Sequence, residues 1–280
     1  GYLREGRAKG DATPRVTAER GGAALVDAGN GLAYPALAMA EAEAEARATA
    51  HGVSFVTVTN SHHAGAMSLP VRRLAERGLV ALAFTNSPYA MPVPGGRRPL
   101  LGTNPVAAAF PRRNGPPLLV DLALSEVARG KIMVAAKEGR PIPEGWALDA
   151  AGNPTTDAKA ALDGAMLAMG GTKGAALALV VELLCVSLGA AAFGFEADSF
   201  FAPSTNPPRL GHTLLAVDPG ALAGHAAYLD RVEALITAML GDEGVRLPGA
   251  RREILRANAM TQGLAVPQAV LDQLHALANS

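Results

Sequence analysis

Two kinds of apolar pattern alternate along the first half of the chain. Short runs rich in β-branched and other apolar residues are typical of buried strands, and longer Ala- and Glu-rich runs are typical of helices. Strands that alternate with helices indicate an α/β protein. The strand runs lie at 21–27, 53–58, 79–84, 106–110 and 118–122. The helix runs lie at 35–50, 69–76 and 125–137, with Ser125 as the expected cap.

The second half is expected to add one strand and four helices. Its most apolar stretch, 174–191, contains Glu182 near the middle. A charge at the centre of a bilayer costs several kcal/mol, so this stretch predicts a core helix and no membrane partner. Segment 138–157 is rich in Pro and Gly and predicts a loop. A strand at 212–217 and helices at 221–240, 250–259 and 265–278 complete one compact unit, 1–280.

Charge and cysteine content narrow the classes of function. Lys and Arg number 25, as do Asp and Glu, and no basic stripe is present, so no nucleic-acid partner is expected. Cys185 is the single cysteine, which excludes a disulfide within the chain and fits a reducing, cytoplasmic location. One cysteine also provides no zinc spacing, and we predict no metal site.

One apparent nucleotide-binding motif is incomplete. The turn Gly29-Asn30-Gly31 follows a strand and precedes a helix, as in a dinucleotide fingerprint. Tyr34 stands where the third glycine is required, and the next strand ends without an acidic residue for a ribose. Any NAD site is therefore expected to be of a non-Rossmann type.

Polar clusters follow or precede several predicted strands. His62 and His63 come directly after one strand, and histidine is the usual proton carrier near neutral pH. Ser87, Thr103 and Asn104 lie in turns that offer hydrogen bonds to a polar ligand. Taken singly, each cluster fits an ordinary surface turn. Together they predict a shaped loop region beside the ends of the strands.

Two further segments favour binding of an anion. Asp121 and Ser125 lie between a strand and a helix, where either side chain also serves as a cap. Gly170, Gly171 and Thr172 precede Lys173 at the start of the apolar helix. Glycines allow close approach of a ligand to the backbone, and the helix terminus and the lysine both favour phosphate or carboxylate.

An ordered series of motifs spans nearly the whole chain. The series is Val26-Asp27, Asn60-Ser61-His62-His63, Thr85-Asn86-Ser87, Pro94-Gly95-Gly96, Gly102-Thr103-Asn104-Pro105, Asp121 with Ser125, Gly130-Lys131, Ile142-Pro143-Glu144-Gly145-Trp146, Gly152-Asn153-Pro154-Thr155-Thr156-Asp157, Gly170-Gly171-Thr172-Lys173-Gly174 and Leu247-Pro248-Gly249. In this order the motifs resemble the malate/L-lactate dehydrogenase family of non-Rossmann oxidoreductases. The run Ser61-His62-His63, with the segment 193–198, is more similar to the cyclic imino-acid reductase branch.

The resemblance implies a fold, a reaction and partners. It implies a homodimer whose mixed α/β sheet, flanked by helices, binds NAD or NADP within about 60–215. Residues 1–59 and 216–280 would form a helix-rich substrate and dimer part. The implied reaction is hydride transfer from the cofactor to a small 2-oxo acid or cyclic imino acid.

The resemblance also implies roles for individual residues. The implied catalytic residues are His63 and Asp121, and the implied substrate contacts are His62, Thr103 and Asn104. The implied cofactor contacts are Ser87, Asp121, Leu122, Ala123, Ser125, Thr172, Lys173, Gly249, Ala250 and Arg251.

Two departures from the family pattern keep an alternative open. The family's Ser-His-Gly motif does not occur in this sequence, which starts where the residues after that motif would stand. The chain would then lack its N-terminal helical part, and the alternative is a catalytically silent relative that acts as a binding or dimer-partner subunit. Leu124 stands where the family favours Thr, which is expected to weaken cofactor binding.

Overall fold

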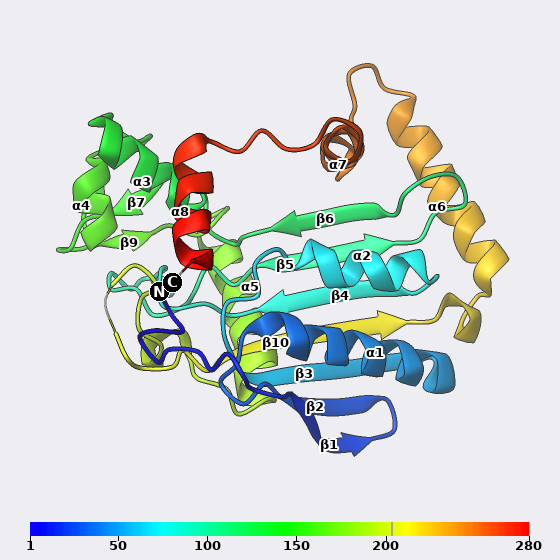
Figure 1. Ribbon diagram of the computed structural model, residues 1–280. Helices are drawn as coiled ribbons and strands as arrows, with labels where there is room; N and C mark the ends of the chain where they lie inside the picture. Colours follow the sequence, from blue (N-terminus) through cyan, green and yellow to red (C-terminus); the bar gives the residue numbers. More distant parts are fainter. Residues whose placement is uncertain (203, 280) are drawn as a thin grey trace. The chain divides into compact units, whose positions relative to one another are not determined.

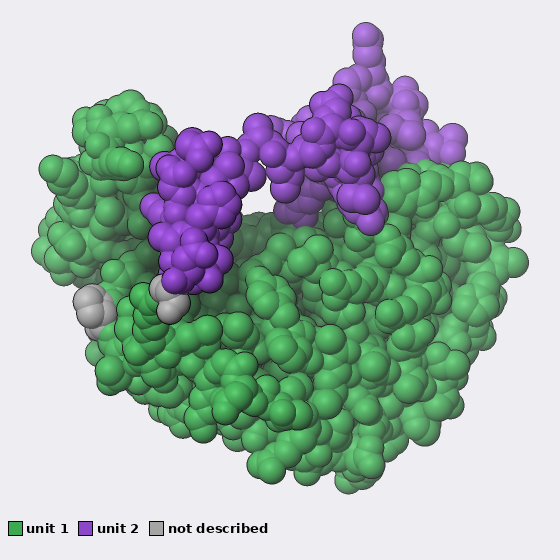
Figure 2. Space-filling model, viewed as in Figure 1, with its two compact units in different colours: residues 1–235 green, residues 236–280 purple. Residues whose placement is uncertain are grey.

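The computed structural model describes residues 1–202 and 204–279. Contacts group the chain into two units, Gly1–Leu235 and Ile236–Ser280, shown in different colours in Figure 2. The domain boundaries expected near residues 60 and 215 fall inside strands β3 (Val53–Ser61) and β10 (Leu210–Val217). Both strands belong to one sheet of the first unit.

A seven-stranded sheet forms the centre of the first unit (Figure 1). Its strand order is β1-β2-β3-β10-β4-β5-β6. Strands β2 and β3 are parallel, and the other neighbouring pairs are antiparallel. The bounds are β1 Arg15–Arg20, β2 Ala23–Asp27, β3 Val53–Ser61, β4 Val80–Thr85, β5 Val106–Phe110, β6 Leu118–Leu122 and β10 Leu210–Val217. This sheet flanked by helices confirms the predicted α/β class.

Helices lie on both faces of this sheet (Figure 1). Helices α1 (Ala33–His51) and α2 (Ser68–Glu76) cover one face, and α5 (Thr172–Glu182) lies on the other. The inward side of α1 carries an alanine every four residues. Because alanine is small, the helix backbone packs closely on the strands. The alanines Ala36, Ala40, Ala44 and Ala48 are almost completely buried.

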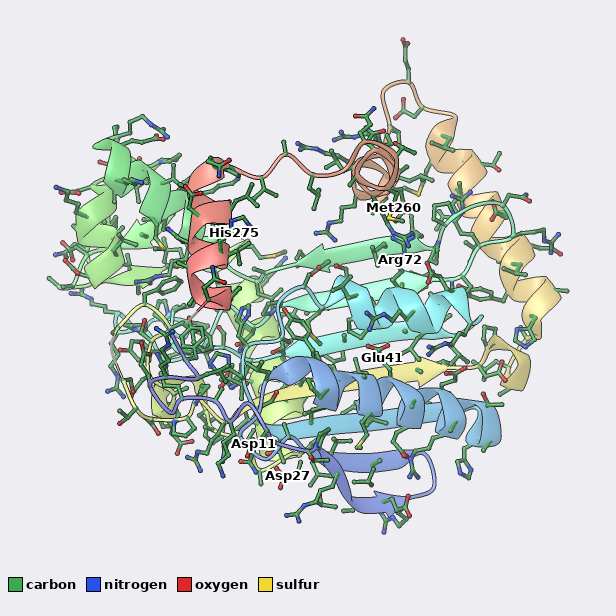
Figure 3. The ribbon with its side chains drawn as sticks, in the orientation of Figure 1. Asp11, Asp27, Glu41, Arg72, Met260 and His275 are labelled. Atoms are coloured by element: carbon green, nitrogen blue, oxygen red, sulfur yellow. The ribbon has the colours of Figure 1, made fainter. Side chains whose placement is uncertain are left out.

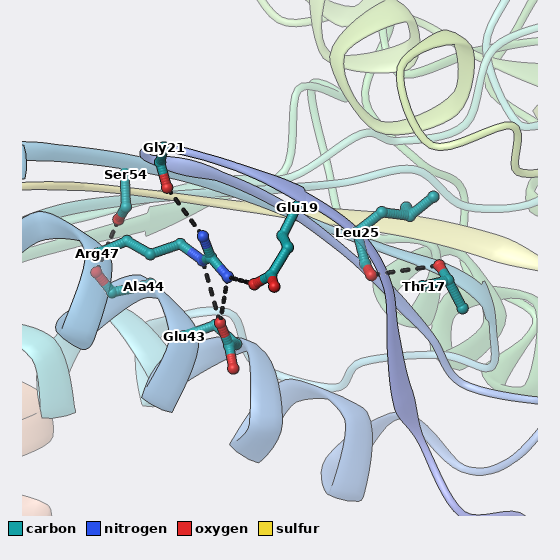
Figure 4. A network of polar contacts seen from close by, with 8 residues as sticks. All are labelled: Thr17, Glu19, Gly21, Leu25, Glu43, Ala44, Arg47 and Ser54. Carbon is teal, nitrogen blue, oxygen red and sulfur yellow. Dashed lines mark hydrogen bonds and ion pairs between the residues drawn. The ribbon is translucent and has the colours of Figure 1, made fainter.

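Charged side chains connect these layers. Arg47 near the end of α1 donates to Gly21 O in the β1–β2 turn at 2.8 Å and to Glu43 Oε2 at 2.9 Å (Figure 4). Glu41 lies on the same helix (Figure 3) and accepts from Arg73 of α2 at 3.0 Å. Burial raises the pKa of Glu41 and the Arg73 charge opposes that rise. These contacts fix α1 relative to the strands at one end and to α2 at its middle.

The middle of the sequence forms a second, smaller sheet. It contains β7 (Ala147–Leu148), β8 (Pro154–Thr155) and β9 (Ala165–Met166), in the order β8-β7-β9. Helices α3 (Arg129–Glu138) and α4 (Ala158–Asp163) accompany it. Segment 138–157, predicted as a loop, therefore contains two short strands. They are too short to give an apolar pattern.

Three helices end the chain. They are α6 (His225–Leu240), α7 (Ala250–Gln262) and α8 (Gln268–Ala278). The sequence predicted all three, although α7 is longer than expected and α6 begins after a separate 3₁₀ turn, Pro219–Ala221. Among residues 1–202 and 204–279, no helix has the length and apolar character needed to cross a membrane.

Several predicted elements differ in detail from the structure. The α-helical part of the apolar stretch ends at Glu182. A π-helical turn, Leu183–Ser187, follows it, so no helix reaches residue 191. The helix expected from Ser125 begins instead at Arg129, and Ser125 Oγ donates to Val127 O at 2.8 Å rather than capping it. Strand β1 was not predicted, because most of its residues are exposed and carry no alternating apolar signal.

Candidate active site

Four connections of the large sheet meet at the same end of its strands. Strands β3, β4 and β6 end there, and β5 begins there, because β4, β5 and β6 are successively antiparallel. His63 follows β3, Ser87 follows β4, Thr103 precedes β5 and Ser125 follows β6. Turn residues far apart in the sequence are thereby brought to one place.

These turns surround a hollow of about 220 Å³, here called the histidine hollow. Five residues predicted to be functional line it: His63, Ser87, Thr103, Ala123 and Ser125. Arg129 and the 199–201 segment complete its wall. At about 30 Å³ per water, the volume accommodates a small organic acid but not a whole dinucleotide.

The environment of His63 fixes its tautomer. Gly65 N–H donates to Nδ1 at 3.0 Å, so the ring proton lies on Nε2. The Phe200 ring stands edge-on to the imidazole, with 5.4 Å between ring centroids. Partial removal from water lowers the pKa of His63, although the residue as a whole is exposed. A neutral His63 therefore presents an Nε2–H donor.

A second histidine pair supports this loop from behind. His212 Nε2 donates to His62 O at 3.0 Å, and its Nδ1 lies 2.6 Å from Thr85 Oγ1. Burial lowers the pKa of His62 and of His212 to about 4. His62 is only 4% exposed and stacks near Tyr2, with 4.6 Å between ring centroids. His62 does not line the hollow, and its predicted contact with a substrate stays a prediction.

Arg129 is a site residue that sequence reasoning missed. It opens α3, its Nη2 donates to Leu162 O at 3.0 Å, and its guanidinium lies 5.4 Å from the Phe201 ring centroid. Its Nε is buried without a partner among the described residues, and burial lowers its pKa. A cation in the first turn of a helix opposes the helix dipole, which is the one sequence signal for a special role.

Neighbouring residues in two turns point in opposite directions. Ser87 and Thr103 line the hollow, and Thr103 N–H donates to Ser87 Oγ at 3.0 Å. Asn104 is fully buried instead, and its amide donates to Glu182 Oε2 at 2.7 Å and to Ala178 O at 2.8 Å. Burial raises the pKa of Glu182. The predicted substrate contact by Asn104 thus becomes an internal tie between the turn and α5.

Two other predicted residues of this region lie outside the lining of the hollow. Asp121 Oδ2 accepts from Ser68 N–H at the start of α2, at 3.2 Å, and the Leu122 side chain is exposed. The carboxylate of Asp121 therefore stabilises a helix start. Leu124 is fully buried in the core. Its side chain packs inside the protein, and its expected effect on cofactor binding stays a prediction.

A second depression of about 390 Å³, here called the glycine hollow, lies beyond the 124–126 segment. Gly95, Gly96, Gly170, Gly171 and Thr172 contribute to its lining. Backbone pairing forms the common wall, because Glu126 N–H donates to Leu167 O and Met169 N–H donates to Leu124 O. Ser125 faces the histidine hollow and Glu126 the glycine hollow. Lys173 is exposed and is not part of either lining.

The remaining predicted cofactor contacts belong to the second unit. Gly249 adopts a φ of +85° as the residue before α7, and Ala250 and Arg251 form the first turn of that helix. The contact of these three residues with a cofactor stays a prediction.

The donors around the two hollows fit a nicotinamide dinucleotide. A Cβ added to Gly170 or Gly171 would meet no atom within 4 Å, so ligand phosphates have room against this backbone. Hydroxyl groups of Ser87, Thr103 and Ser125 suit the polar nicotinamide and ribose groups. The separation of a glycine-lined hollow from one with a titratable group matches a ligand with a phosphate part and a reactive part.

Comparison with known proteins gives the following similarities. The family model described as malate/L-lactate dehydrogenase matches residues 1–275. The chain is 51% identical over 277 residues to a (2R)-3-sulfolactate dehydrogenase (NADP(+)) of Chromohalobacter salexigens, covering 99% of this chain and 82% of that protein. It is 41% identical over 279 residues to a Δ1-pyrroline-2-carboxylate/Δ1-piperideine-2-carboxylate reductase of Pseudomonas syringae pv. tomato, covering 99% and 80%.

Solved structures show the same fold. The Δ1-piperideine-2-carboxylate reductase of Pseudomonas syringae superposes with a TM-score of 0.92 at 40% identity, covering 98% of this chain and 83% of that one. The sulfolactate dehydrogenase of Methanocaldococcus jannaschii gives a TM-score of 0.88 at 29% identity, covering 99% and 81%.

Proposed function

Because the chain belongs to the malate/L-lactate dehydrogenase family, as its motifs predict, we propose that it reduces a small 2-oxo acid or cyclic imino acid with NAD(P)H. The observation that carries this proposal is the placement of His63, Arg129 and the hydroxyl groups of Ser87, Thr103 and Ser125 around one small hollow. A glycine-lined depression adjoins it across a shared backbone wall.

The cofactor assignment follows from this division. Gly170, Gly171 and Thr172 would hold the phosphates, and Ser87, Thr103 and Ser125 would bind the nicotinamide end. When bound, the reduced cofactor supplies a hydride to the C=O or C=N carbon of the substrate. The sulfolactate dehydrogenase of Chromohalobacter salexigens is named for NADP(+), and we propose NADPH as the preferred donor here.

Arg129 is proposed to bind the substrate carboxylate. Its unpartnered Nε and the fork geometry of a guanidinium suit a carboxylate. The 2-oxo acid and imino-acid substrate classes share a carboxylate beside the reacting carbon. One anchoring residue therefore serves both, and the pocket wall decides between them.

His63 is proposed to serve the heteroatom of the substrate. Its Nε2–H donates a hydrogen bond to the carbonyl oxygen or imine nitrogen as negative charge develops there. Complete transfer of that proton requires a second proton at Nδ1, which displaces the contact with Gly65. The reduction is therefore expected to be faster at a pH low enough to populate the imidazolium.

We also propose a cytoplasmic homodimer. Beyond the exposed Lys173 in its first turn, the outward side of α5 is apolar, and Leu177, Leu179 and Val180 are each more than 40% exposed there. Exposed apolar patches of this kind commonly mark protein interfaces. Light scattering after size-exclusion chromatography tests the assembly, and a monomeric mass at micromolar concentration would contradict it.

Titration with NADPH and NADH, followed by the fluorescence of the reduced nicotinamide, tests the function. We expect saturable binding with preference for NADPH. Turnover is then compared between cyclic imino acids and 2-oxo acids with and without a sulfonate group. A folded chain that binds neither dinucleotide would overturn the proposal.

A further inference from the structure

A buried arginine lies behind the wall of the histidine hollow. Arg7 is only 1% exposed. Its Nη2 donates to Asp198 O at 3.0 Å, and its Nη1 donates to Ser199 O at 3.0 Å and to Ala202 O at 3.4 Å. One guanidinium thus donates hydrogen bonds to three carbonyl groups of a segment almost two hundred residues away in the sequence.

The same guanidinium also organises aromatic rings. Its carbon lies 5.5 Å from the Tyr2 ring centroid and 5.7 Å from that of Phe200. The Phe200 ring in turn contacts the imidazole of His63, with 5.4 Å between centroids. Ser199 and Phe200 both line the hollow. Arg7 is therefore connected to His63 through a single intervening ring.

Stability alone does not account for a charge at this position. Among the described carboxylates, none forms an ion pair with Arg7, and its buried Nε has no partner in the same part of the chain. A buried charge without a counter-ion carries a desolvation cost that an apolar residue of similar size would avoid. The planar fork of Arg, unlike Lys, can donate to several carbonyl groups and stack on rings at once.

We propose that Arg7 is a positioning residue that holds the 198–202 segment, and with it Phe200, against His63. This inference rests on the proposed reduction and adds a residue that shapes the substrate side of its site. The carbonyl groups of an irregular segment have no ladder partners, so the guanidinium supplies donors that fix the segment. The hollow then has a closed aromatic side.

Removal of Arg7 is expected to admit water to His63. The titratable or charged groups around that ring are His62 in the same loop, His212 of β10, Arg7 behind Phe200, and Arg129 and Tyr89 across the hollow. Because partial burial lowers the pKa of His63, loosening of Phe200 should return it toward its ordinary value. Loss of a nearby positive charge also raises a histidine pKa, so Arg7→Lys, which keeps the charge, and Phe200→Leu, which leaves Arg7 in place, separate the two causes.

The experiment compares Arg7→Ala, Arg7→Lys and Phe200→Leu with Arg112→Ala. Arg112 is a matched control, because it is a largely buried arginine that pairs with Glu233 and does not line the hollow. The pKa of His63 is measured by NMR on histidine-labelled protein. The Kd for NADPH, kcat and KM are measured on the same samples.

We expect Arg7→Ala to raise KM by about tenfold, because a loosened Phe200 positions the substrate less well, with little change in the Kd for NADPH. Its His63 pKa should rise. Phe200→Leu should reproduce both effects, Arg7→Lys should show smaller ones, and Arg112→Ala neither. The double variant Arg7→Ala/Phe200→Leu should be no worse than either single change, because both act through one ring.

Additive effects in the double variant, or an unchanged His63 pKa in both Arg7→Lys and Phe200→Leu, would overturn the proposal. These two variants keep the test valid if Arg7→Ala fails to fold. Failure of the proposed function is a distinct result, because the wild-type chain would then bind no dinucleotide while the His63 pKa still reports on Arg7.

Discussion

The histidine hollow and the glycine hollow share a wall but differ in what forms their surface. The first is lined by side chains with chemistry, namely an imidazole, a guanidinium, hydroxyl groups and an aromatic ring. The second owes its room to glycines, whose backbone adopts φ near +60° at Gly170 and Gly171. A side-chain surface selects and activates a small reactant, whereas a bare backbone binds phosphate by its N–H groups. Substitutions in the two hollows should therefore have different effects on binding and turnover.

Loss of the imidazole should have the largest effect. His63→Gln is expected to lower kcat by about 10²–10⁴-fold, the usual contribution of a general acid or base, with NADPH binding retained. Steady-state kinetics and fluorescence titration separate the two quantities. The exposed His51→Gln provides a control substitution. Loss of NADPH affinity equal to the loss of kcat would place His63 in cofactor binding instead.

Loss of the Arg129 guanidinium should have the second-largest effect. Arg129→Met removes the proposed carboxylate anchor and is expected to raise KM by about 100-fold, within the cost of truncating one partner of a buried charge pair. Arg129→Lys should lie between, because it keeps the charge and loses the fork. Arg140→Met, at a surface arginine that pairs with Glu138, is the control. An unchanged KM in Arg129→Met would remove this residue from the site.

Acid should lower the stability of the fold through the buried His62 and His212. His62 and His212 have pKa values of about 4 in the folded chain and near 6.5 when unfolded. The unfolded chain therefore binds more protons between pH 6.5 and 4, and stability falls as the pH is lowered through that window. The expected slope is about 3 kcal/mol per pH unit for two such groups. Urea unfolding at pH 7, 6 and 5 measures it.

The acid effect has its own internal test. His212→Gln should remove about half of that slope, since one of the two titrating groups is lost. An unaltered slope would show that the acid sensitivity arises elsewhere in the fold.

Alteration of the glycine hollow should weaken cofactor binding and leave the substrate side unchanged. Gly171→Ala and Gly139→Ala each place a Cβ at φ near +65°, where nothing in the chain lies within 4 Å. Gly139→Ala is expected to lose about 1–2 kcal/mol of stability, the cost of the left-handed helical conformation for an L residue. Gly171→Ala should lose more, because its ψ of −127° lies outside that region. Only Gly171→Ala should weaken NADPH binding, by about tenfold, as one phosphate contact is lost. Equal affinities in the two variants would place the phosphates elsewhere.

The smallest effect is expected at Lys173. Its side chain is exposed, and exposed ion pairs contribute about 0–1 kcal/mol, so Lys173→Ala should raise the Kd for NADPH by less than about fivefold. The difference from wild type should vanish at high salt. A persistent, large difference at 0.5 M salt would show direct burial of this lysine against the ligand.

Apolar patterning was sufficient for most of the sheet but not for the roles of polar residues. Alternation or apolar runs identified β3 to β6 because one or both of their faces are buried. In the turns, Ser87 and Thr103 face the hollow while Asn104 next to them is buried. Asn104 adopts a φ of +40°, which turns its side chain inward, and the sequence shows neither this turn nor which side is open.

Long-range polar contacts left no local signal either. Arg7 binds carbonyl groups of a distant irregular segment, and every residue has a carbonyl group, so no pattern marks the partner. His212 was missed for a similar reason, since its ring is buried in β10 and bonds to the backbone of His62. Strand pairing, which brings these residues together, is decided by the whole fold.

The place of β10 in the sheet has a consequence for how the chain is made. It is the last strand in the sequence, yet it lies between β3 and β4, pairing Val217 with Val53 and with Val80. Until residue 217 has left the ribosome, β1–β3 and β4–β6 are two pieces whose facing edges are unpaired. Such edges invite pairing with other chains, and closing so long a loop slows folding. The nascent protein therefore has its greatest need of chaperones just before its central strand is synthesised.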